Sequence, residues 1–330
     1  MTLAGKTALV TGATGFLGGH LVARLAADGV HVRALARRSG RDRYIKDLAN
    51  VNVVMGDITD PASIAPHMQG VDVVFHVAAA LGGDLATQRR INKDGTAHVM
   101  RAAADADVGR VVHVSTVSVY GYRYRTDITE DLPLDPGADP YHITKVEAEG
   151  MVHEIGAARD LDYTIVRPAM IYGPRSTAWT RTMFNVAKRG IWLGDGSGST
   201  FPIYVDDVVD LCIVAATHPA AVGQAFNCAP DPSPTWREFL GAYQALMGRD
   251  RWIGVPVPIL KTLVYGVARL APGESRLKDL PDLLGLVTGN ITYKTTKARE
   301  LLGWTASVEL EDGINRCVPC LREKGLLSDG

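Results

Sequence analysis

The first half of the chain alternates short runs rich in valine and isoleucine with stretches of helical periodicity, and this order restricts the fold more than any other feature. The runs lack a polar residue at every second position, as is usual for strands covered on both faces. They comprise Lys6–Thr11, His31–Ala36, Asn52–Met55, Val71–His76, Val111–Ser115 and Tyr163–Arg167. The helical stretches are Phe16–Asp28, Pro61–His67, Arg89–Ala106 and Tyr141–Arg159. Alternating strands and helices join by right-handed crossovers, so the sequence predicts an α/β fold with a doubly wound parallel sheet.

The alternation loosens after Pro168, where glycine and proline become frequent. Candidate helices remain at Trp179–Lys188, Asp207–Thr217, Thr235–Met247, Ile259–Leu270, Thr295–Leu302 and Leu310–Lys324. We therefore expect residues 1–168 to form the sheet domain, to which later segments such as 204–224 return. Residues 169–330 are expected to form a smaller, mostly helical substrate lobe over the carboxyl edge of the sheet, where open α/β proteins bind ligands.

A glycine-rich turn stands between the first expected strand and the first expected helix, and reads Val10-Thr-Gly-Ala-Thr-Gly-Phe-Leu-Gly18. Gly12 suits a sharp turn, Gly15 lets a pyrophosphate approach the main chain, and Gly18 allows close helix packing. The helix N-terminus that follows favours an anion. This register predicts a dinucleotide site of the Rossmann type, whereas the alternative is a plain glycine-rich turn. The residues of this turn assigned to the cofactor are Gly12, Thr14, Gly15, Phe16 and Leu17.

The end of the second expected strand bears on which dinucleotide is bound. NAD sites usually carry an acidic residue there, while NADP sites place an arginine nearby. The expected acidic position is Ala36, and Arg37 and Arg38 follow it. Because a guanidinium grips a 2′-phosphate with two hydrogen bonds, we favour NADP over NAD and assign Arg37 to the cofactor. Alternatively, both arginines form a solvated strand end.

Tyr141 and Lys145 lie four residues apart in an expected helix and so share one of its faces. A nearby ammonium favours a phenolate and lowers the pKa of the phenol from about 10. The pair is therefore expected to exchange a proton with an alcohol or ketone near neutral pH. The spacing also occurs by chance in surface helices, but here a hydroxyl cluster at Ser115 and Thr116 precedes it.

Taken together, these motifs resemble the extended short-chain dehydrogenase/reductase superfamily. The shared segments run in order over nearly the whole chain: Thr11-Gly-x-x-Gly-x-x-Gly18, Gly56-Asp57-Ile58, Val74-Phe-His-Val-Ala-Ala79, Asn92-x-x-Gly-Thr96, Val114-Ser-Thr-x-Ser-Val-Tyr-Gly121, Tyr141-x-x-x-Lys145, Arg167-Pro-x-x-Ile-Tyr-Gly-Pro174, Tyr204-Val-Asp-Asp207 and Lys297-Ala-x-x-Leu-Leu-Gly303. The resemblance implies an enzyme of that superfamily.

The resemblance also implies residue roles. Asp57 and Ile58 are expected to contact the adenine, and the turn at Val77, Ala78 and Ala79 to pass under the ribose. Tyr141 is expected to be the proton donor or acceptor, while Lys145 hydrogen-bonds the nicotinamide ribose. Thr116 is expected to hold the substrate oxygen, with Ser115 and Ser118 as competitors. The nicotinamide-lining residues are expected to be Pro168, Ala169 and Ile171, and the candidate substrate contacts are Ser118 and Met170.

Two further expectations concern the helices of the first domain. Asn92 is interpreted as a structural residue that caps the helix opening there, because asparagine suits an N-cap. By resemblance, the helices near Asn92–Ala106 and Tyr141–Arg159 are expected to form the interface of a homodimer.

Departures from the superfamily patterns narrow the reaction. Sugar 4,6-dehydratases carry Asp-Glu after the catalytic Thr, where this chain has Val117 and Ser118, so dehydration is disfavoured. Nucleotide-sugar enzymes carry a diphosphate-binding arginine where this chain has Thr200. Another arginine is needed to replace it, the candidates being Arg175, Arg181 and Arg123.

The remaining pattern resembles the 3β-hydroxysteroid dehydrogenase-like and dihydroflavonol reductase-like branch. The apolar stripe in Ile259–Leu270 either packs on the domain core, walls an apolar pocket or lies against a membrane. We expect an NADP-dependent oxidoreductase that transfers hydride between nicotinamide and a ketone or secondary alcohol of a small, fairly apolar molecule. The alternatives are a nucleotide-sugar epimerase or ketoreductase and a non-catalytic NADP-binding regulator.

Composition excludes several other classes. The net charge of −1 gives no basic excess for nucleic acid. The most apolar late stretch, 255–271, is interrupted by prolines and cations and is too short to span a bilayer. With no leader pattern at the N-terminus and 4 cysteines, the expected location is the cytoplasm. Cys317-Val-Pro-Cys320 lacks further ligands nearby, so we expect no metal and interpret it as a terminal helix whose end is marked by Pro319.

Overall fold

The computed structural model describes residues 2–38, 40, 42–121, 126–270 and 280–328. A seven-stranded parallel sheet in the order β10-β6-β5-β4-β1-β2-β3 forms its centre. The strands are β1 (Thr7–Thr11), β2 (His31–Ala36), β3 (Val51–Met55), β4 (Val73–His76), β5 (Arg110–Val114), β6 (Tyr163–Pro168) and β10 (Ala225–Cys228). The order reverses between β1 and β4, so this is the doubly wound sheet that the sequence predicts.

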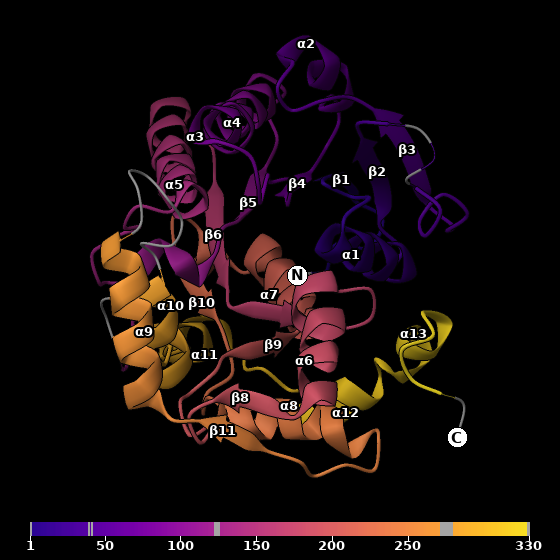
Figure 1. Cartoon of the computed structure of the whole chain (residues 1–330). Helices are drawn as coiled ribbons and strands as arrows, with labels where there is room; N and C mark the ends of the chain where they lie inside the picture. Colours follow the sequence, from indigo (N-terminus) through magenta and orange to yellow (C-terminus); the bar gives the residue numbers. More distant parts are fainter. Residues whose placement is uncertain (1, 39, 41, 122–125, 271–279, 329–330) are drawn as a thin grey trace.

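Helices cover both faces of the sheet (Figure 1). Leu9 of β1 faces α4 (Gly95–Asp105) and α5 (Pro140–Arg159), whereas Ala8 and Val10 face α1 (Phe16–Ala27) and α7 (Val205–Thr217). Neighbouring strand residues thus enter two separate apolar cores. This explains why the strands read as continuous apolar runs rather than as polar alternations.

Short elements complete the first half. They are α2 (Pro61–Ile64), α3 (Leu85–Gln88), the 3₁₀ turns η1 (Ala65–His67) and η3 (Val117–Tyr120), and the π-helical turn η2 (Arg89–Asp94). The helix expected to begin at Arg89 begins four residues earlier, because Asp84 caps α3 by accepting a hydrogen bond from the Thr87 amide.

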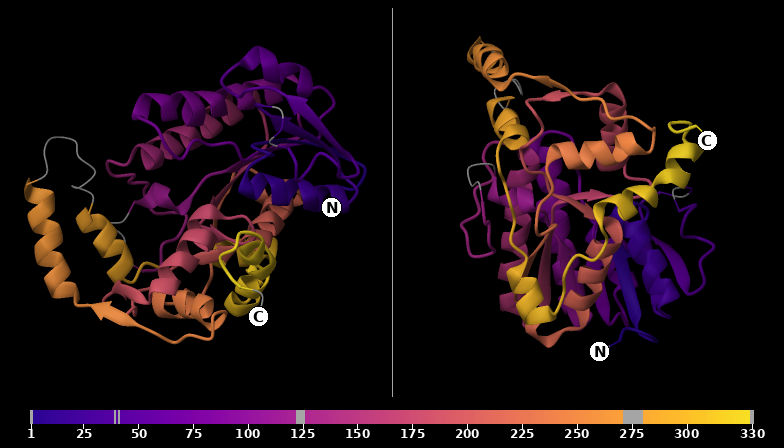
Figure 2. Two further views of the ribbon diagram at one scale, coloured as in Figure 1. Left: turned by 45° about the vertical axis from the view of Figure 1, so that its right-hand side comes forward. Right: turned by 90° about the horizontal axis from the view of Figure 1, so that it is seen from below.

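The second half contains the short parallel pairs β7 (Met170–Tyr172) with β9 (Pro202–Tyr204), and β8 (Ile191–Leu193) with β11 (Ile253–Val255). Its other elements are η4 (Thr177–Thr182), α6 (Met183–Arg189), η5 (Pro219–Ala221), α8 (Trp236–Ala245), α9 (Val257–Leu270), α10 (Leu280–Thr288), α11 (Thr296–Leu302), α12 (Leu310–Asn315) and α13 (Val318–Glu323). Tyr172, Phe239 and Tyr243 pack edge to face at its centre. Helix α9 lies against α10 at the outer edge, on the side away from α13 (Figure 2).

Several expectations for this half were wrong in detail. The sequence did not predict α10 or the five strands β7 to β11. The single helix expected over Leu310–Lys324 is two helices, and Pro319 lies in the first turn of α13 rather than at its end. A first-turn proline needs no hydrogen-bond donor, so it begins a helix readily.

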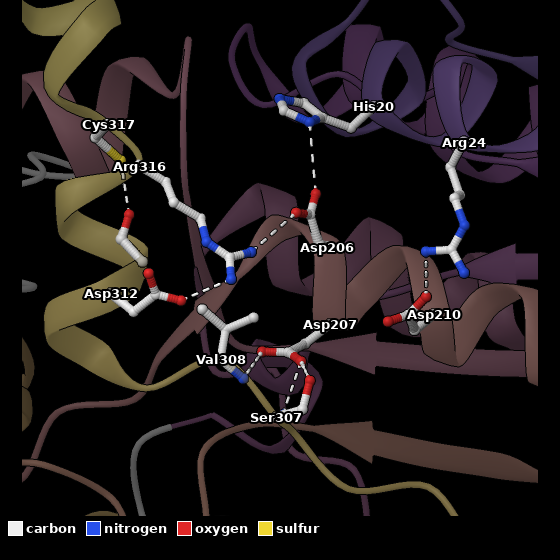
Figure 3. A network of polar contacts seen from close by, with 11 residues as sticks. His20, Arg24, Asp206, Asp207, Asp210, Ser307, Val308, Asp312, Arg316 and Cys317 are labelled. Carbon is white, nitrogen blue, oxygen red and sulfur yellow. Dashed lines mark hydrogen bonds and ion pairs between the residues drawn. The ribbon is translucent and has the colours of Figure 1, made fainter. Parts of the chain in front are cut away.

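Helix α7 joins the first helix to the C-terminal segment (Figure 3). Asp207 accepts hydrogen bonds from the Ser307 amide at 2.8 Å and from the Val308 amide at 3.3 Å. On the same helix, Asp210 pairs with Arg24 of α1 at 2.7 Å. Helix α7 also packs on β5 and β6, and the Gly223 amide donates to the Tyr163 carbonyl oxygen, so the segment 204–224 lies against the sheet. The division at residue 168 remains a prediction.

Candidate active site

The glycine turn has the close packing that its sequence predicts. Gly12 has a φ of +67°, and a side-chain carbon there would lie 2.8 Å from the Ala78 amide nitrogen. A side-chain carbon on Gly18 would lie 2.2 Å from the Gly12 carbonyl oxygen. Only glycine therefore fits at either position, and the turn is held against the residues that follow β4.

The N-terminus of α1 is suited to an anion. Its N-cap is Gly15, which offers no side-chain cap, and its first turn, containing Phe16 and Leu17, has no acidic residue. The free amides and the helix dipole there favour a phosphate group. The residues of this turn therefore fit a dinucleotide, as the sequence predicts, with Val77–Ala79 beside them.

A chain of hydrogen bonds fixes that neighbouring turn. The Ala78 amide donates to Thr11 Oγ1 at 3.2 Å, and Thr11 Oγ1 lies 2.7 Å from Nδ1 of His76. His76 Nε2 lies 2.9 Å from Thr96 Oγ1, which donates to the Asn92 carbonyl oxygen. Since the Thr96 hydroxyl donates its hydrogen bond to the Asn92 carbonyl oxygen, it accepts from His76; the tautomer assigned to His76 therefore carries its proton on Nε2, and Nδ1 accepts from Thr11.

Tyr141 stands in the first turn of α5, which Asp139 caps by accepting from the Tyr141 amide at 2.8 Å. Thr116 is the N-cap of η3, and its hydroxyl meets the Tyr141 phenol. The structure thus brings Thr116, which follows β5, and Tyr141, at the start of α5, together at the carboxyl edge of the sheet. The predicted decrease of the Tyr141 pKa is wrong: burial raises that pKa to about 12, Thr116 opposes the increase and Asp139 adds to it.

Lys145 lies one helical turn beyond Tyr141 and is 2% exposed. Its ammonium donates to the Val114 carbonyl oxygen at 2.8 Å and lies 3.3 Å from Nε2 of His113. Burial lowers its pKa to about 8, against an opposing effect of the Glu149 carboxylate. The Lys145 ammonium is thus bound to the Val114 carbonyl oxygen at the end of β5. It does not lower the pKa of the Tyr141 phenol as expected.

The matches to known proteins cover most of the chain. Residues 8–229 match the model of the NAD dependent epimerase/dehydratase family. UDP-glucose 4-epimerase of Mycolicibacterium smegmatis is 33% identical over 96% of this chain and 98% of its own. Ceramide reductase of Caulobacter vibrioides is 30% identical over 92% of this chain and 88% of its own. The crystal structure of UDP-glucuronic acid 4-epimerase from Bacillus cereus in complex with NAD has a TM-score of 0.78, with 21% identity over 96% of this chain and 99% of that one.

The chain belongs to the NAD dependent epimerase/dehydratase family. It is therefore an NAD(P)-dependent enzyme of the extended short-chain dehydrogenase/reductase class, and the resemblance stated from its motifs is confirmed. The family's dinucleotide supplies or accepts a hydride when bound.

Other predicted cofactor residues of this epimerase/dehydratase family member lie around the same edge. Asp57 accepts hydrogen bonds from the amide and the hydroxyl of Thr59, both at 2.9 Å. Ile58 is buried against Gly95, where a side-chain carbon would lie 2.8 Å from Ile58 Cδ1. Arg37 is exposed at the end of β2. Their adenine and phosphate contacts remain predictions.

The residues expected to line the nicotinamide and substrate follow β6. Pro168 ends that strand and the Ala169 amide donates to the Cys228 carbonyl oxygen, while Ile171 is half-buried in β7. Met170 is buried, and its sulfur accepts a hydrogen bond from Thr200 at 3.9 Å.

The hydroxyl residues beside Thr116 differ in their surroundings. The Ser118 hydroxyl lies 3.0 Å from Thr116 Oγ1. The Ser115 hydroxyl is buried and has no hydrogen-bond partner among the described residues. The Ser118 hydroxyl is thus the one of the two that contacts Thr116, and the roles of all three hydroxyls remain predictions.

Asn92 has a structural role but does not cap a helix, so that expectation was half wrong. Its side chain accepts from the Ala80 amide at 2.7 Å and donates to Thr144 Oγ1 at 3.0 Å. It lies inside the π-helical turn η2, so it joins the turn after β4 to helix α5.

Sequence reasoning did not single out His76 and His113, which face each other across β4 and β5. They are paired in register, both fully buried, with ring centres 5.2 Å apart. Burial and the Lys145 charge lower the pKa of both, to about 3 for His76, so both rings are neutral. In the sequence, each of these histidines lies at or near the end of an apolar run expected to be a strand. That pattern could have predicted the pair.

The remaining expectations concern metals and membranes. Within the described ranges, no group of three or more His, Cys, Asp or Glu residues is placed to hold a metal ion. Cys317 is buried, its thiol donates to the Gly313 carbonyl oxygen at 3.3 Å, and burial raises its pKa to about 12. No described helix is long and apolar enough to cross a membrane.

Proposed function

We propose that this enzyme is an NADP-dependent oxidoreductase that transfers hydride between nicotinamide and a ketone or secondary alcohol of a small, fairly apolar molecule. The observation that carries the proposal is the contact of the half-buried Tyr141 phenol with Thr116 at the carboxyl edge of the sheet. With its pKa near 12, Tyr141 keeps its proton at neutral pH and is ready to donate it to a carbonyl oxygen that is becoming an alkoxide. Thr116 holds the same oxygen, and Lys145 holds the nicotinamide ribose.

The substrate class is supported by what replaces the diphosphate-binding arginine. Thr200 is fully buried and directed at the sulfur of Met170, so it offers no cation to a nucleotide sugar. Arg175, one of the possible replacements, lies over Tyr44 on the α1 side of the molecule. Arg181 is exposed in η4, and Arg123 lies outside the described residues. The apolar side chains of Ile259 and Leu270 on α9, 57% and 85% exposed, favour an apolar substrate.

The preference for NADP is supported by the end of β2. Ala36 is buried and apolar where an acidic residue would repel a phosphate, and the exposed side chains of Arg37 and Arg38 follow it. A 2′-phosphate there gains two charge-assisted hydrogen bonds that the ribose hydroxyl of NAD cannot provide.

A nucleotide-sugar epimerase is the second candidate, because a UDP-glucose 4-epimerase is 33% identical over nearly the whole chain. An epimerase keeps its oxidised cofactor and is stabilised by a uridine diphosphate, since ligands that bind only the folded state raise its melting temperature. A non-catalytic regulator is disfavoured by the presence of both Tyr141 and Lys145.

Melting temperatures with NADPH, NADH, UDP and dTDP distinguish these candidates. We expect NADPH to raise the melting temperature most. We also expect the protein to consume NADPH when it is supplied with a panel of apolar ketones. Tyr141→Phe should lower NADPH consumption by about 100-fold or more and keep the increase in melting temperature with NADPH. The control Tyr163→Phe, at the opposite end of β6, should keep both. A larger shift with UDP than with NADPH, together with UDP-glucose epimerisation, would refute the proposal.

We also infer that the enzyme forms a homodimer through α4 and α5, which pack side by side on one face of the sheet. Light scattering after size-exclusion chromatography tests this inference. A monomer at micromolar concentration contradicts it.

A further inference from the structure

The loop after β7 returns to the first helix of the dinucleotide site. The Pro174 carbonyl oxygen lies 3.1 Å from Nε2 of His20 on α1. A side-chain carbon built on Gly19 would lie 3.3 Å from a terminal nitrogen of Arg175. The Arg175 guanidinium therefore lies directly against the end of the first turn of α1, whose N-terminal amides fit a phosphate.

Arg175 has no acidic partner there. Its guanidinium carbon lies 4.5 Å from the centre of the Tyr44 ring, and within the described part of the chain no carboxylate pairs with it. Arg43 lies over the same ring, also at 4.5 Å, and donates to the Tyr44 hydroxyl at 2.6 Å. Burial lowers the pKa of Arg175, and the Arg43 charge acts in the same direction. Two cations are thus gathered at one aromatic ring, and none of the described residues supplies an anion to them.

The backbone of Arg175 is also unfavourable. Its φ is +76°, in the left-handed region that glycine adopts freely and arginine rarely does. Half-burial of a charge, repulsion from Arg43 and a left-handed backbone all oppose this arrangement, which indicates that it is kept for a ligand.

The position identifies the ligand's chemistry. Arg43 and Tyr44 belong to the connection after β2, beginning at the strand end where the adenosine ribose is expected, and Arg175 touches the helix that receives the diphosphate. We propose that Arg175 and Arg43, joined by Tyr44, form a site for a phosphate group of the bound dinucleotide. This site is additional to the glycine turn and to Arg37, and it rests on the proposed use of a dinucleotide.

Calorimetric titration with NADP⁺ and NAD⁺ tests the site without any need for turnover. The unchanged protein is titrated first, and failure to bind either dinucleotide would refute the proposed redox function together with this site. Arg175→Gln and Arg43→Gln should then each weaken NADP⁺ binding by about tenfold or more. Selective loss of NADP⁺ affinity assigns the site to the 2′-phosphate, whereas equal loss for both dinucleotides assigns it to the diphosphate.

The matched control is Arg237→Gln, because Arg237 also lies over an aromatic ring, that of Trp252 at 5.5 Å, but in the second half of the chain. It should bind both dinucleotides like the unchanged protein. Arg175→Gly separates binding from folding: glycine suits the left-handed backbone, so this variant should melt no lower than the unchanged protein and still lose dinucleotide affinity. If both Arg175 variants fold and bind NADP⁺ and NAD⁺ with unchanged affinity, the proposal is overturned and the stacked arginines only tie the two loops together.

Discussion

The carboxyl edge of the sheet and the outer helix α9 differ in how far their side chains are exposed to water. At the edge, Lys145, His76 and His113 are almost fully buried and are fixed by main-chain carbonyls and threonine hydroxyls. On α9, Ile259, Tyr265, Val267 and Leu270 are largely exposed, and the helix packs mainly on α10. The edge is built to hold reacting groups still, which any substrate of the family requires. The outer helix is not tied to these groups, so substitutions on its exposed face are expected to leave them in place.

If the edge carries the chemistry, the largest effect is expected from its phenol. Tyr141→Phe removes the proton donor and leaves the ring packing in place, so turnover should fall about 100- to 10,000-fold. Single-turnover kinetics with saturating NADPH measures this effect. A decrease smaller than about tenfold would show that another group delivers the proton.

The next largest effect is expected from the buried ion pair behind the edge. Arg167 binds Glu149 through two hydrogen bonds, at 2.7 and 3.0 Å, with 5% and 1% of the side chains exposed. Arg167→Met leaves the carboxylate buried and unpaired, and should lower the free energy of unfolding by about 3–5 kcal/mol. Urea denaturation measures the change. The double variant Arg167→Met/Glu149→Leu should recover much of it, and equal stability of the single and double variants would contradict the account.

The buried lysine predicts a pH dependence of stability. Because its pKa falls to about 8 in the folded protein, below its unfolded value, the unfolded chain binds more protons between these two values. The Lys145 contribution is therefore unfavourable at pH 7 and is relieved as pH rises through 8 towards 10.

Lys145→Met should consequently be more stable than the unchanged protein at pH 7, by at most about 3 kcal/mol, with the difference shrinking by pH 10. Urea denaturation at a series of pH values tests this, and a difference independent of pH would show that Lys145 titrates normally.

The smallest effect is expected on α9. Ile259→Ser and Leu270→Ser remove apolar atoms that already face water, so each should change the free energy of unfolding by less than about 0.5 kcal/mol. The control Phe239→Ala, in the fully buried face of α8, should cost about 3–5 kcal/mol. If the α9 variants also keep NADPH binding but raise the KM for apolar ketones, α9 contributes to substrate choice. An unchanged KM would remove it from the substrate site.

The same contrast explains what could be predicted from the sequence. The strands of the first half were predicted to within about two residues because burial on both faces leaves an unbroken apolar run, and the positions of Gly12, Tyr141 and Thr116 follow from that frame. The three-residue strands β7, β8, β9 and β11 are too short to show any periodicity. The high pKa of Tyr141 could not be predicted either, because it depends on burial by segments distant in sequence and on Lys145 being bound to the Val114 carbonyl oxygen.

Strand β10 has a consequence for how the chain is made. It pairs with β6 but is contributed by residues 225–228, more than fifty positions later. Until that stretch leaves the ribosome, β6 is an open edge with unsatisfied amides and carbonyls, a surface that invites pairing with other chains. A fragment ending at Pro168 would keep this edge permanently. A fragment of residues 1–168 produced alone should therefore aggregate. A fragment that extends through Cys228 contains β10 and so closes this edge of the sheet.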